Sequence, residues 1–130
     1  MALAAVNEDL LEVAERGDLP AVKRFLTTGA EINFQNKYGT SALMLASLHG
    51  HREIVQALLD KGTEVNAKNK DSVTALILAS QQGHREIVQA LLAKGAEVNA
   101  MDEDGWTALK SASKKGHWEV REMLIKAGAK

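Results

Sequence analysis

The chain has 130 residues, of which 45% are hydrophobic and 25% are charged, and its formal net charge at pH 7 is −1. These values are typical of one globular domain with its own core, and the charge balance gives no electrostatic reason to expect nucleic acid or an anionic membrane as a partner. The sequence contains no cysteine, which excludes disulfides, thiolate nucleophiles and cysteine–metal sites.

A period of 33 residues runs along the chain. The decamer GHREIVQALL occurs at 50–59 and again at 83–92. Two series of glycines keep the same interval, namely Gly17, Gly50, Gly83 and Gly116, and Gly29, Gly62, Gly95 and Gly128. A fixed period of this size indicates stacked units. We predict four units, at about 1–33, 34–66, 67–99 and 100–130, of which the first and the last are caps.

Each unit has the same order of signals. A hydroxyl residue at Ser41, Thr74 or Thr107 is expected to cap the N-terminus of a first helix, which then ends at a glycine such as Gly50. The second helix follows, with an apolar stripe formed in the second unit by Ile54, Val55, Leu58 and Leu59. It ends at Lys61-Gly62 and leads into an irregular loop. The pattern predicts an all-α repeat solenoid of helix-turn-helix units.

Equivalent positions in successive units indicate where the stack ends. Apolar residues at Leu11, Met44 and Ile77 are replaced by Lys110 in the last unit, and Val22, Val55 and Val88 are replaced by Arg121. A terminal repeat needs a polar outer face where an inner repeat has a neighbour. We therefore assign Lys110 and Arg121 to a C-terminal cap and Glu12 with Ala21 to an N-terminal cap. Ser111 does not follow this rule.

Three segments give the chain its resemblance to a known family: Gly39-Thr40-Ser41-Ala42-Leu43, Ser72-Val73-Thr74-Ala75-Leu76 and Gly105-Trp106-Thr107-Ala108-Leu109. With the 33-residue period they resemble the ankyrin repeat over about residues 8–130. The family's usual Thr-Pro-Leu-His is altered in every unit, and Ser72 stands where a turn glycine is usual. We expect mild backbone strain at Ser72 if that position needs a positive φ. Asn66 and Asn99 resemble positions that are hydroxylated in some family members.

The histidines raise the question of a metal site. His51, His84 and His117 occur once per unit, and packed helices lie roughly 8–10 Å apart, whereas a zinc–nitrogen bond is about 2.0–2.1 Å. We therefore interpret them as packing residues at the start of each second helix. His49 forms a His-Gly-His pair with His51, but no other residue completes a site. We expect neither a metal nor a cofactor.

Catalysis is not expected either. Triad chemistry requires a nucleophile, a base and an orienting group to converge on one point. Here each serine and histidine of this kind belongs to a series repeated along the stack, such as Ser47, Ser80 and Ser113. The sequence also lacks a phosphate-binding glycine-rich loop, an H-E-x-x-H motif and an EF-hand. We predict that the protein is not an enzyme.

The resemblance implies a concave binding surface made of the loop tips and the exposed ends of the first helices. We expect Tyr38 and Trp106 to be interface anchors, although Trp106 could instead cover its own turn. Leu48 and Val73, together with Met44 and Ile77, are expected to add a hydrophobic strip. The predicted contact residues are Lys37, Tyr38, Thr40, Leu48, His49, Lys70, Asp71, Val73, Gln81, Gln82, Glu103, Asp104, Trp106, Lys114 and Lys115.

We therefore predict a scaffold that binds a partner protein without catalysis. The alternative is an engineered self-assembling block that forms a symmetric homo-oligomer, for which Trp118 is a separate exposed aromatic candidate. The near-identity of the middle units suits an engineered ankyrin scaffold or a recent natural duplication. The N-terminal MALAAV lacks the basic flank of a secretion signal, and no apolar run approaches the length of a membrane span, so we expect a cytoplasmic or recombinant soluble protein.

Overall fold

The structure is a computed structural model that describes the backbone of residues 3–130 and the side chains of residues 5–130. Residues 1–2 of the predicted first unit lie outside the described residues. In the described part the chain forms eight helices and one isolated β-bridge, between Met101 and Thr107. The helices are α1 (Leu3–Arg16), α2 (Leu19–Thr27), α3 (Ala42–His49), α4 (Arg52–Asp60), α5 (Ala75–Gln82), α6 (Arg85–Ala93), α7 (Ala108–Lys115) and α8 (Trp118–Lys126).

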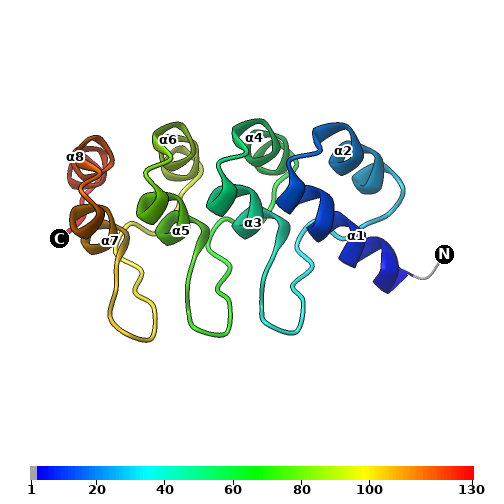
Figure 1. Ribbon diagram of the computed structural model, residues 1–130, viewed down its shortest axis with the longest axis horizontal. Coiled ribbons are helices and arrows are strands. Elements are labelled where there is room, and N and C mark those ends of the chain that lie inside the picture. The colour runs from blue at the N-terminus through cyan, green and yellow to red at the C-terminus, as the bar shows by residue number, and fades with distance from the viewer. Residues whose placement is uncertain (1–2) are drawn as a thin grey trace.

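The eight helices form four antiparallel pairs stacked in a single row (Figure 1). The first helices α1, α3, α5 and α7 lie side by side, the second helices form a row above them in the view, and the long loops extend below, away from the second helices (Figure 1). This arrangement confirms the predicted all-α repeat solenoid of four helix-turn-helix units.

The capping residues lie where the sequence predicts. The hydroxyl oxygen of Ser41 accepts a hydrogen bond from the Met44 N–H at 3.3 Å, and those of Thr74 and Thr107 do the same at the starts of α5 and α7. Each of these helices ends at a left-handed glycine, with φ 77° at Gly50. Local sequence therefore sets both ends of the first helices.

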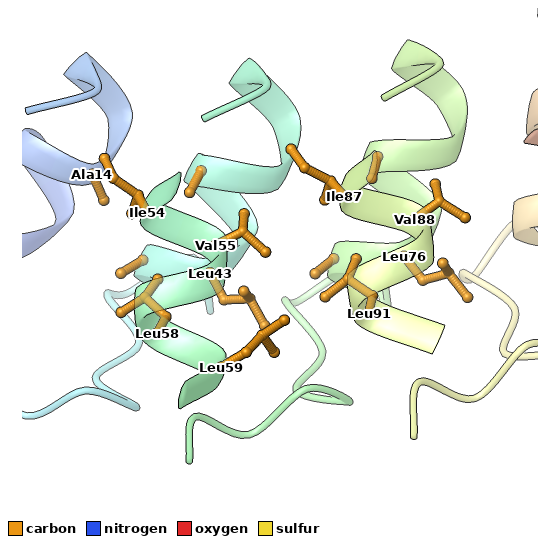
Figure 2. Packing of buried hydrophobic residues seen from close by; sticks show 14 of the residues in the cluster. Ala14, Leu43, Ile54, Val55, Leu58, Leu59, Leu76, Ile87, Val88 and Leu91 are labelled. Carbon is orange, nitrogen blue, oxygen red and sulfur yellow. The ribbon is translucent and has the colours of Figure 1, made fainter. Parts of the chain in front are cut away.

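The core is a continuous apolar layer between the helix rows (Figure 2). The stripe on α4 is buried at all four predicted positions, Ile54, Val55, Leu58 and Leu59. On α6 the equivalent Ile87, Val88 and Leu91 are buried in the same way. Because every pair contributes to the same layer, each one covers the apolar side of its neighbour.

Adjacent pairs are joined by histidine. The His84 Nε2 lies 3.0 Å from the backbone oxygen of Leu48, at the end of the preceding first helix, and His51 makes the equivalent contact with Glu15 at 2.8 Å. The His84 ring packs on Gly50, where an added Cβ would lie only 2.7 Å from its Cε1 atom. The histidines are packing residues, and each packs on the turn of the preceding pair.

Asparagine joins the loops that follow the second helices. The Asn33 Oδ1 accepts a hydrogen bond from the Glu64 N–H at 2.8 Å, and the Asn66 Oδ1 accepts one from the Glu97 N–H at the same distance. The Asn99 Oδ1 repeats the contact with the backbone N–H of Lys130 at 3.0 Å. These bonds fix the spacing between successive loops.

The structure corrects the predicted hydrophobic strip. Met44 and Ile77 are only 2% and 4% exposed, because each lies where the next helix pair covers it, whereas the equivalent Lys110 of the last pair is exposed. The C-terminal cap is therefore confirmed at Lys110, and Arg121 is half-exposed beside Glu122. Of the predicted strip, Leu48 and Val73 remain partly exposed.

Of the two residues assigned to the N-terminal cap, Glu12 is exposed and Ala21 is not. Ala21 is buried in the core cluster, because α2 packs against both α1 and α4. Glu12 is exposed, but it borders a hollow that α1 forms with Leu45 of α3. Ser111, which the rule left unexplained, is buried next to the hollow beside Trp106.

Candidate protein-interaction face

Three loops, which we call fingers, have tips of the same construction: residues 34–41, 67–74 and 100–107. In the first finger the Asn36 Oδ1 accepts hydrogen bonds from the backbone N–H groups of Tyr38 at 2.9 Å and Thr40 at 3.0 Å. Asn69 and Asp102 make the same pair of bonds in the second and third fingers. The side chain of this residue thus closes each tip as a turn, and the residues after it point their side chains outward or along the row.

The fingers are also bonded to one another. The Lys70 N–H donates to the Tyr38 oxygen at 3.1 Å, and the Glu103 N–H donates to the Asp71 oxygen at 3.0 Å. The Gln35 Nε2 adds a bond to the Lys68 oxygen at 2.9 Å. The tips therefore form a connected row of fixed spacing rather than three independent loops.

The positive φ on which the expected strain at Ser72 depends is present. Its φ is 63°, in the left-handed region, while the equivalent Gly39 and Gly105 have φ values of 78° and 82°. Side chains with a Cβ disfavour this region. The second finger therefore keeps the same turn as its neighbours in spite of its residue type.

The fingers and the solvent-facing side of α1, α3, α5 and α7 together form what we call the concave face (Figure 1). All fifteen predicted contact residues lie outside the buried core. Ten are exposed: Lys37, Tyr38, His49, Lys70, Asp71, Gln82, Glu103, Asp104, Lys114 and Lys115. Five are half-buried: Thr40, Leu48, Val73, Gln81 and Trp106.

A hollow of about 300 Å³ opens on this face between α5, α7 and the third finger. Trp106 borders it together with Leu78 of the preceding pair, and the Lys114 Nζ lies 5.0 Å from the centroid of the indole ring. Its lining is Val73, Ile77, Leu78, Gln81, Asp102, Trp106, Ser111, Lys114 and Lys115. A hollow whose lining combines apolar side chains with polar and charged groups suits a side chain of a partner.

A second hollow, of about 420 Å³, lies at the other end of the same face. Thr40 and Leu45 border it on one side, and α1 contributes four carboxylates, Glu8, Asp9, Glu12 and Glu15. Sequence reasoning missed these acidic residues because it mapped the face only from the first finger onward. The signal was present, since Glu15 precedes Leu48 by the 33-residue period.

Two exposed aromatic residues lie at distant places. Tyr38 is 59% exposed on the first finger, with the Lys37 Nζ 5.1 Å from its ring centroid. Trp118 is 63% exposed at the start of α8 and borders a hollow of about 520 Å³ to which no finger contributes. In that hollow Arg85 pairs with Glu119, and the backbone N–H of Glu86, followed by the charges of Arg85 and Arg52, lowers the pKa of the Glu86 carboxyl.

Within residues 3–130 no cluster of three or more histidine, aspartate or glutamate residues has a geometry that would hold a metal ion. Over the same residues, no helix combines the length and the apolar character needed to cross a membrane. The buried hydroxyls of Ser47 and Ser80 have no hydrogen-bond partner, and both lie between helices at positions where a small residue permits close packing.

The family model described as "Ankyrin repeats (3 copies)" matches residues 10–102 and 70–130. The chain therefore belongs to the ankyrin-repeat family, whose repeats generally mediate protein–protein interaction and whose fold is typically non-catalytic. A curated relative is "Probable E3 ubiquitin-protein ligase XBOS33" of Oryza sativa subsp. japonica, 43% identical over 51 residues. That match covers 39% of this chain and 10% of the rice protein.

Proposed function

We propose that this protein is a non-catalytic scaffold that binds a partner protein through the concave face. The observation that carries the proposal is the pair of aromatic residues at the two ends of the finger row. Tyr38 presents its ring to solvent, and Trp106 borders the hollow of about 300 Å³. Tyrosine and tryptophan supply large contact area with few rotatable bonds, which is why they are frequent anchors of interfaces.

The rigidity of the face supports the same function. The fingers are bonded to one another through Lys70 and Glu103, and their tips are closed by Asn36, Asn69 and Asp102. Binding to a surface that is already ordered loses little conformational entropy. Residues that differ between repeats are thus held at constant spacing by a frame that hardly varies.

The test is affinity capture from an extract of the source organism, with partners quantified by mass spectrometry. Three variants are compared with the unmodified protein: Tyr38→Ala, Trp106→Ala and, as a matched control, Trp118→Ala, which removes an exposed aromatic away from the fingers. We expect Tyr38→Ala and Trp106→Ala to weaken the specific partner by about tenfold or more, as truncation of an interface anchor does, with little change in the melting temperature. If both variants retain every partner and Trp118→Ala loses one, the interface lies around Trp118 on α8 and not on the concave face.

Self-assembly is the second candidate, and the exposure of Trp118 beside the hollow of about 520 Å³ favours it. Exposed aromatic residues next to a hollow suit a symmetric contact between two copies. Sedimentation over a range of concentrations decides between the two functions. A dimer that Trp118→Ala dissociates supports self-assembly, and a monomer at the highest concentration supports the scaffold.

A further inference from the structure

The first helices carry a charge that changes sign along the stack. Helix α1 has four carboxylates and one guanidinium, a net charge of −3. Helices α3 and α5 contain no acidic residue, lysine or arginine, and α7 has three lysines, a net charge of +3. Among the second helices, α2 has two basic residues and no acidic one, and α4, α6 and α8 each have both signs. The change from acidic to basic along the stack is therefore a property of the first helices.

Both charged ends open onto hollows of the concave face. At the α1 end, Glu8, Asp9, Glu12 and Glu15 border the hollow of about 420 Å³. At the α7 end, Lys114 and Lys115 border the hollow of about 300 Å³, together with apolar side chains that include Leu78 and Trp106. Between the two ends, helices α3 and α5 carry no Asp, Glu, Lys or Arg, and Leu48 and Gln81 are partly exposed.

The lysines at the α7 end are free to meet a partner. Lys114 and Lys115 are exposed and form no ion pair with any side chain of residues 5–130. The Lys114 ammonium is held over the Trp106 ring, which places its charge at the rim of the hollow.

At the α1 end, Arg16 pairs with Glu12 at 3.3 Å and with Asp18 at 3.7 Å. The Glu15 Oε2 lies 3.6 Å from the Nε2 of His49. Glu8 and Asp9 have no ion pair among the described side chains. The α1 end therefore has more carboxylates than cationic side chains that pair with them.

We infer that the concave face binds one segment of a partner protein whose charge runs in the opposite sense. Its basic end lies against α1, an apolar side chain enters the hollow beside Trp106, and its acidic end meets Lys114 and Lys115. This inference rests on the proposed function and names the chemistry of its partner. Helix spacings of roughly 8–10 Å place α1 and α7 about 24–30 Å apart, which an extended segment of about eight or nine residues spans.

The fingertips have the opposite order of charge, which determines where the segment lies. The first tip carries Lys37, the second carries Lys70 beside Asp71, and the third carries Glu103 and Asp104. An acidic partner end is repelled by the third tip and attracted by α7. The segment therefore follows the helices rather than the tips, and a uniformly charged segment is disfavoured at one end or the other.

The experiment uses a phage-displayed library of random peptides of about 12 residues, a length that covers the distance from α1 to α7. Peptides selected on the unmodified protein should carry a basic cluster and an acidic cluster at opposite ends, with apolar residues between them. Their binding should weaken about tenfold in Trp106→Ala, because Trp106 borders the hollow that the apolar side chain enters.

Charge-reversed proteins give the decisive comparison. The variant Glu12→Lys with Glu15→Lys should select peptides that are acidic at both ends, and Lys114→Glu with Lys115→Glu should select peptides that are basic at both ends. The control Glu53→Lys with Asp60→Lys reverses two exposed carboxylates of α4 and should select the same peptides as the unmodified protein. Circular dichroism checks folding, and Lys114→Gln with Lys115→Gln, which should lose the acidic preference alone, replaces the reversed variant if that one unfolds.

Three outcomes would overturn the inference. If the selected peptides depend on Trp106 but keep the same charges in every variant, the charge order plays no part and the proposed function stands. If no selected peptide depends on either aromatic residue, the proposed function itself fails. If the unmodified protein is a dimer that Lys114→Glu with Lys115→Glu dissociates, the occupant of the face is a second copy of this chain.

Discussion

Ser72 shows how the repeated frame imposes a conformation on a single residue. Its φ of 63° matches the two equivalent glycines, and the tip is held there by the bonds that Asn69 accepts from Asp71 and Val73. The left-handed region costs a residue with a Cβ about 1–2 kcal/mol. We expect Ser72→Gly to raise the free energy of unfolding by about 1 kcal/mol, measured by urea denaturation.

The comparison for this prediction is Gly39→Ala in the first finger. There a Cβ would meet φ 78° and would also lie 2.7 Å from the Asn69 Cα, so we expect a loss of more than about 1 kcal/mol. Ser72→Ala should leave stability within a few tenths of a kcal/mol, roughly the scale of a neutral exchange. An unchanged urea midpoint in Ser72→Gly would show that the turn is not strained.

Single residues were predictable from the sequence where their role is local. Ser41, Thr74 and Thr107 act on N–H groups three residues away, so sequence spacing suffices to identify them. Met44 and Ile77 were misplaced because their exposure depends on the next helix pair, which local spacing does not describe. The series Leu11, Met44, Ile77 and Lys110 does indicate that Met44 and Ile77 are buried, since only the residue of the last unit is charged.

At the scale of the helix pair, the contact of histidine on glycine couples neighbours. The His84 ring packs on Gly50, whereas among the described residues nothing lies within 4 Å of a Cβ added at Gly116. Both glycines have left-handed φ values of 77° and 75°. Gly50→Ala and Gly116→Ala therefore share the backbone penalty, and only Gly50→Ala adds a clash between pairs.

This difference gives a second prediction. We expect Gly116→Ala to lower the free energy of unfolding by about 1–2 kcal/mol and Gly50→Ala to lower it by about 2–5 kcal/mol, since overpacking adds roughly 1–3 kcal/mol. In the His84→Ala background, Gly50→Ala should lower the free energy of unfolding only by about as much as Gly116→Ala does, because the ring with which the new Cβ clashes is absent. Chemical denaturation of the four proteins measures this cycle, and equal penalties in both backgrounds would contradict the coupling.

The helices of the inner repeats were predictable because the first helices carry start and stop signals and the second helices carry an apolar stripe. The stripe of Ile54, Val55, Leu58 and Leu59 defines one buried side. The partner of each histidine was not predictable, since the ring of His84 bonds to Leu48, 36 residues earlier and in another repeat. The repeat boundaries at 33, 66 and 99 remain a prediction.

At the scale of the whole molecule, the order of charge along the concave face emerges only when equivalent positions of all four pairs are compared. Glu15, Leu48, Gln81 and Lys114 occupy one such series. Net charge hides it, since −3 on α1 and +3 on α7 cancel. Stacking places these opposite charges at the two ends of one surface, although the composition of the chain is nearly neutral. The sequence reveals this separation of charge only when the order in which the pairs stack is known.

The ends of the stack support the last prediction. Lys110 and Arg121 occupy positions that are apolar and buried in the inner pairs, at Ile77 and Val88. The double variant Lys110→Ile with Arg121→Val gives the last pair the apolar surface that an inner pair presents to its neighbour. In the part of the chain that the structure describes, no further pair covers that surface. We expect little loss of stability, because both side chains reach solvent, and a marked rise in self-association measured by sedimentation.

The control is Lys94→Ile with Lys126→Val, which removes the same charge at positions equivalent to the exposed Lys61 and Asp60. These side chains face solvent in every pair, so the stack has no surface to extend there. The control should sediment like the unmodified protein at equal concentration. If both variants associate to the same extent, general hydrophobicity is responsible and the end of the stack is not. If only the first variant associates, the two cationic side chains are what keeps this side of α7 and α8 from packing against another copy.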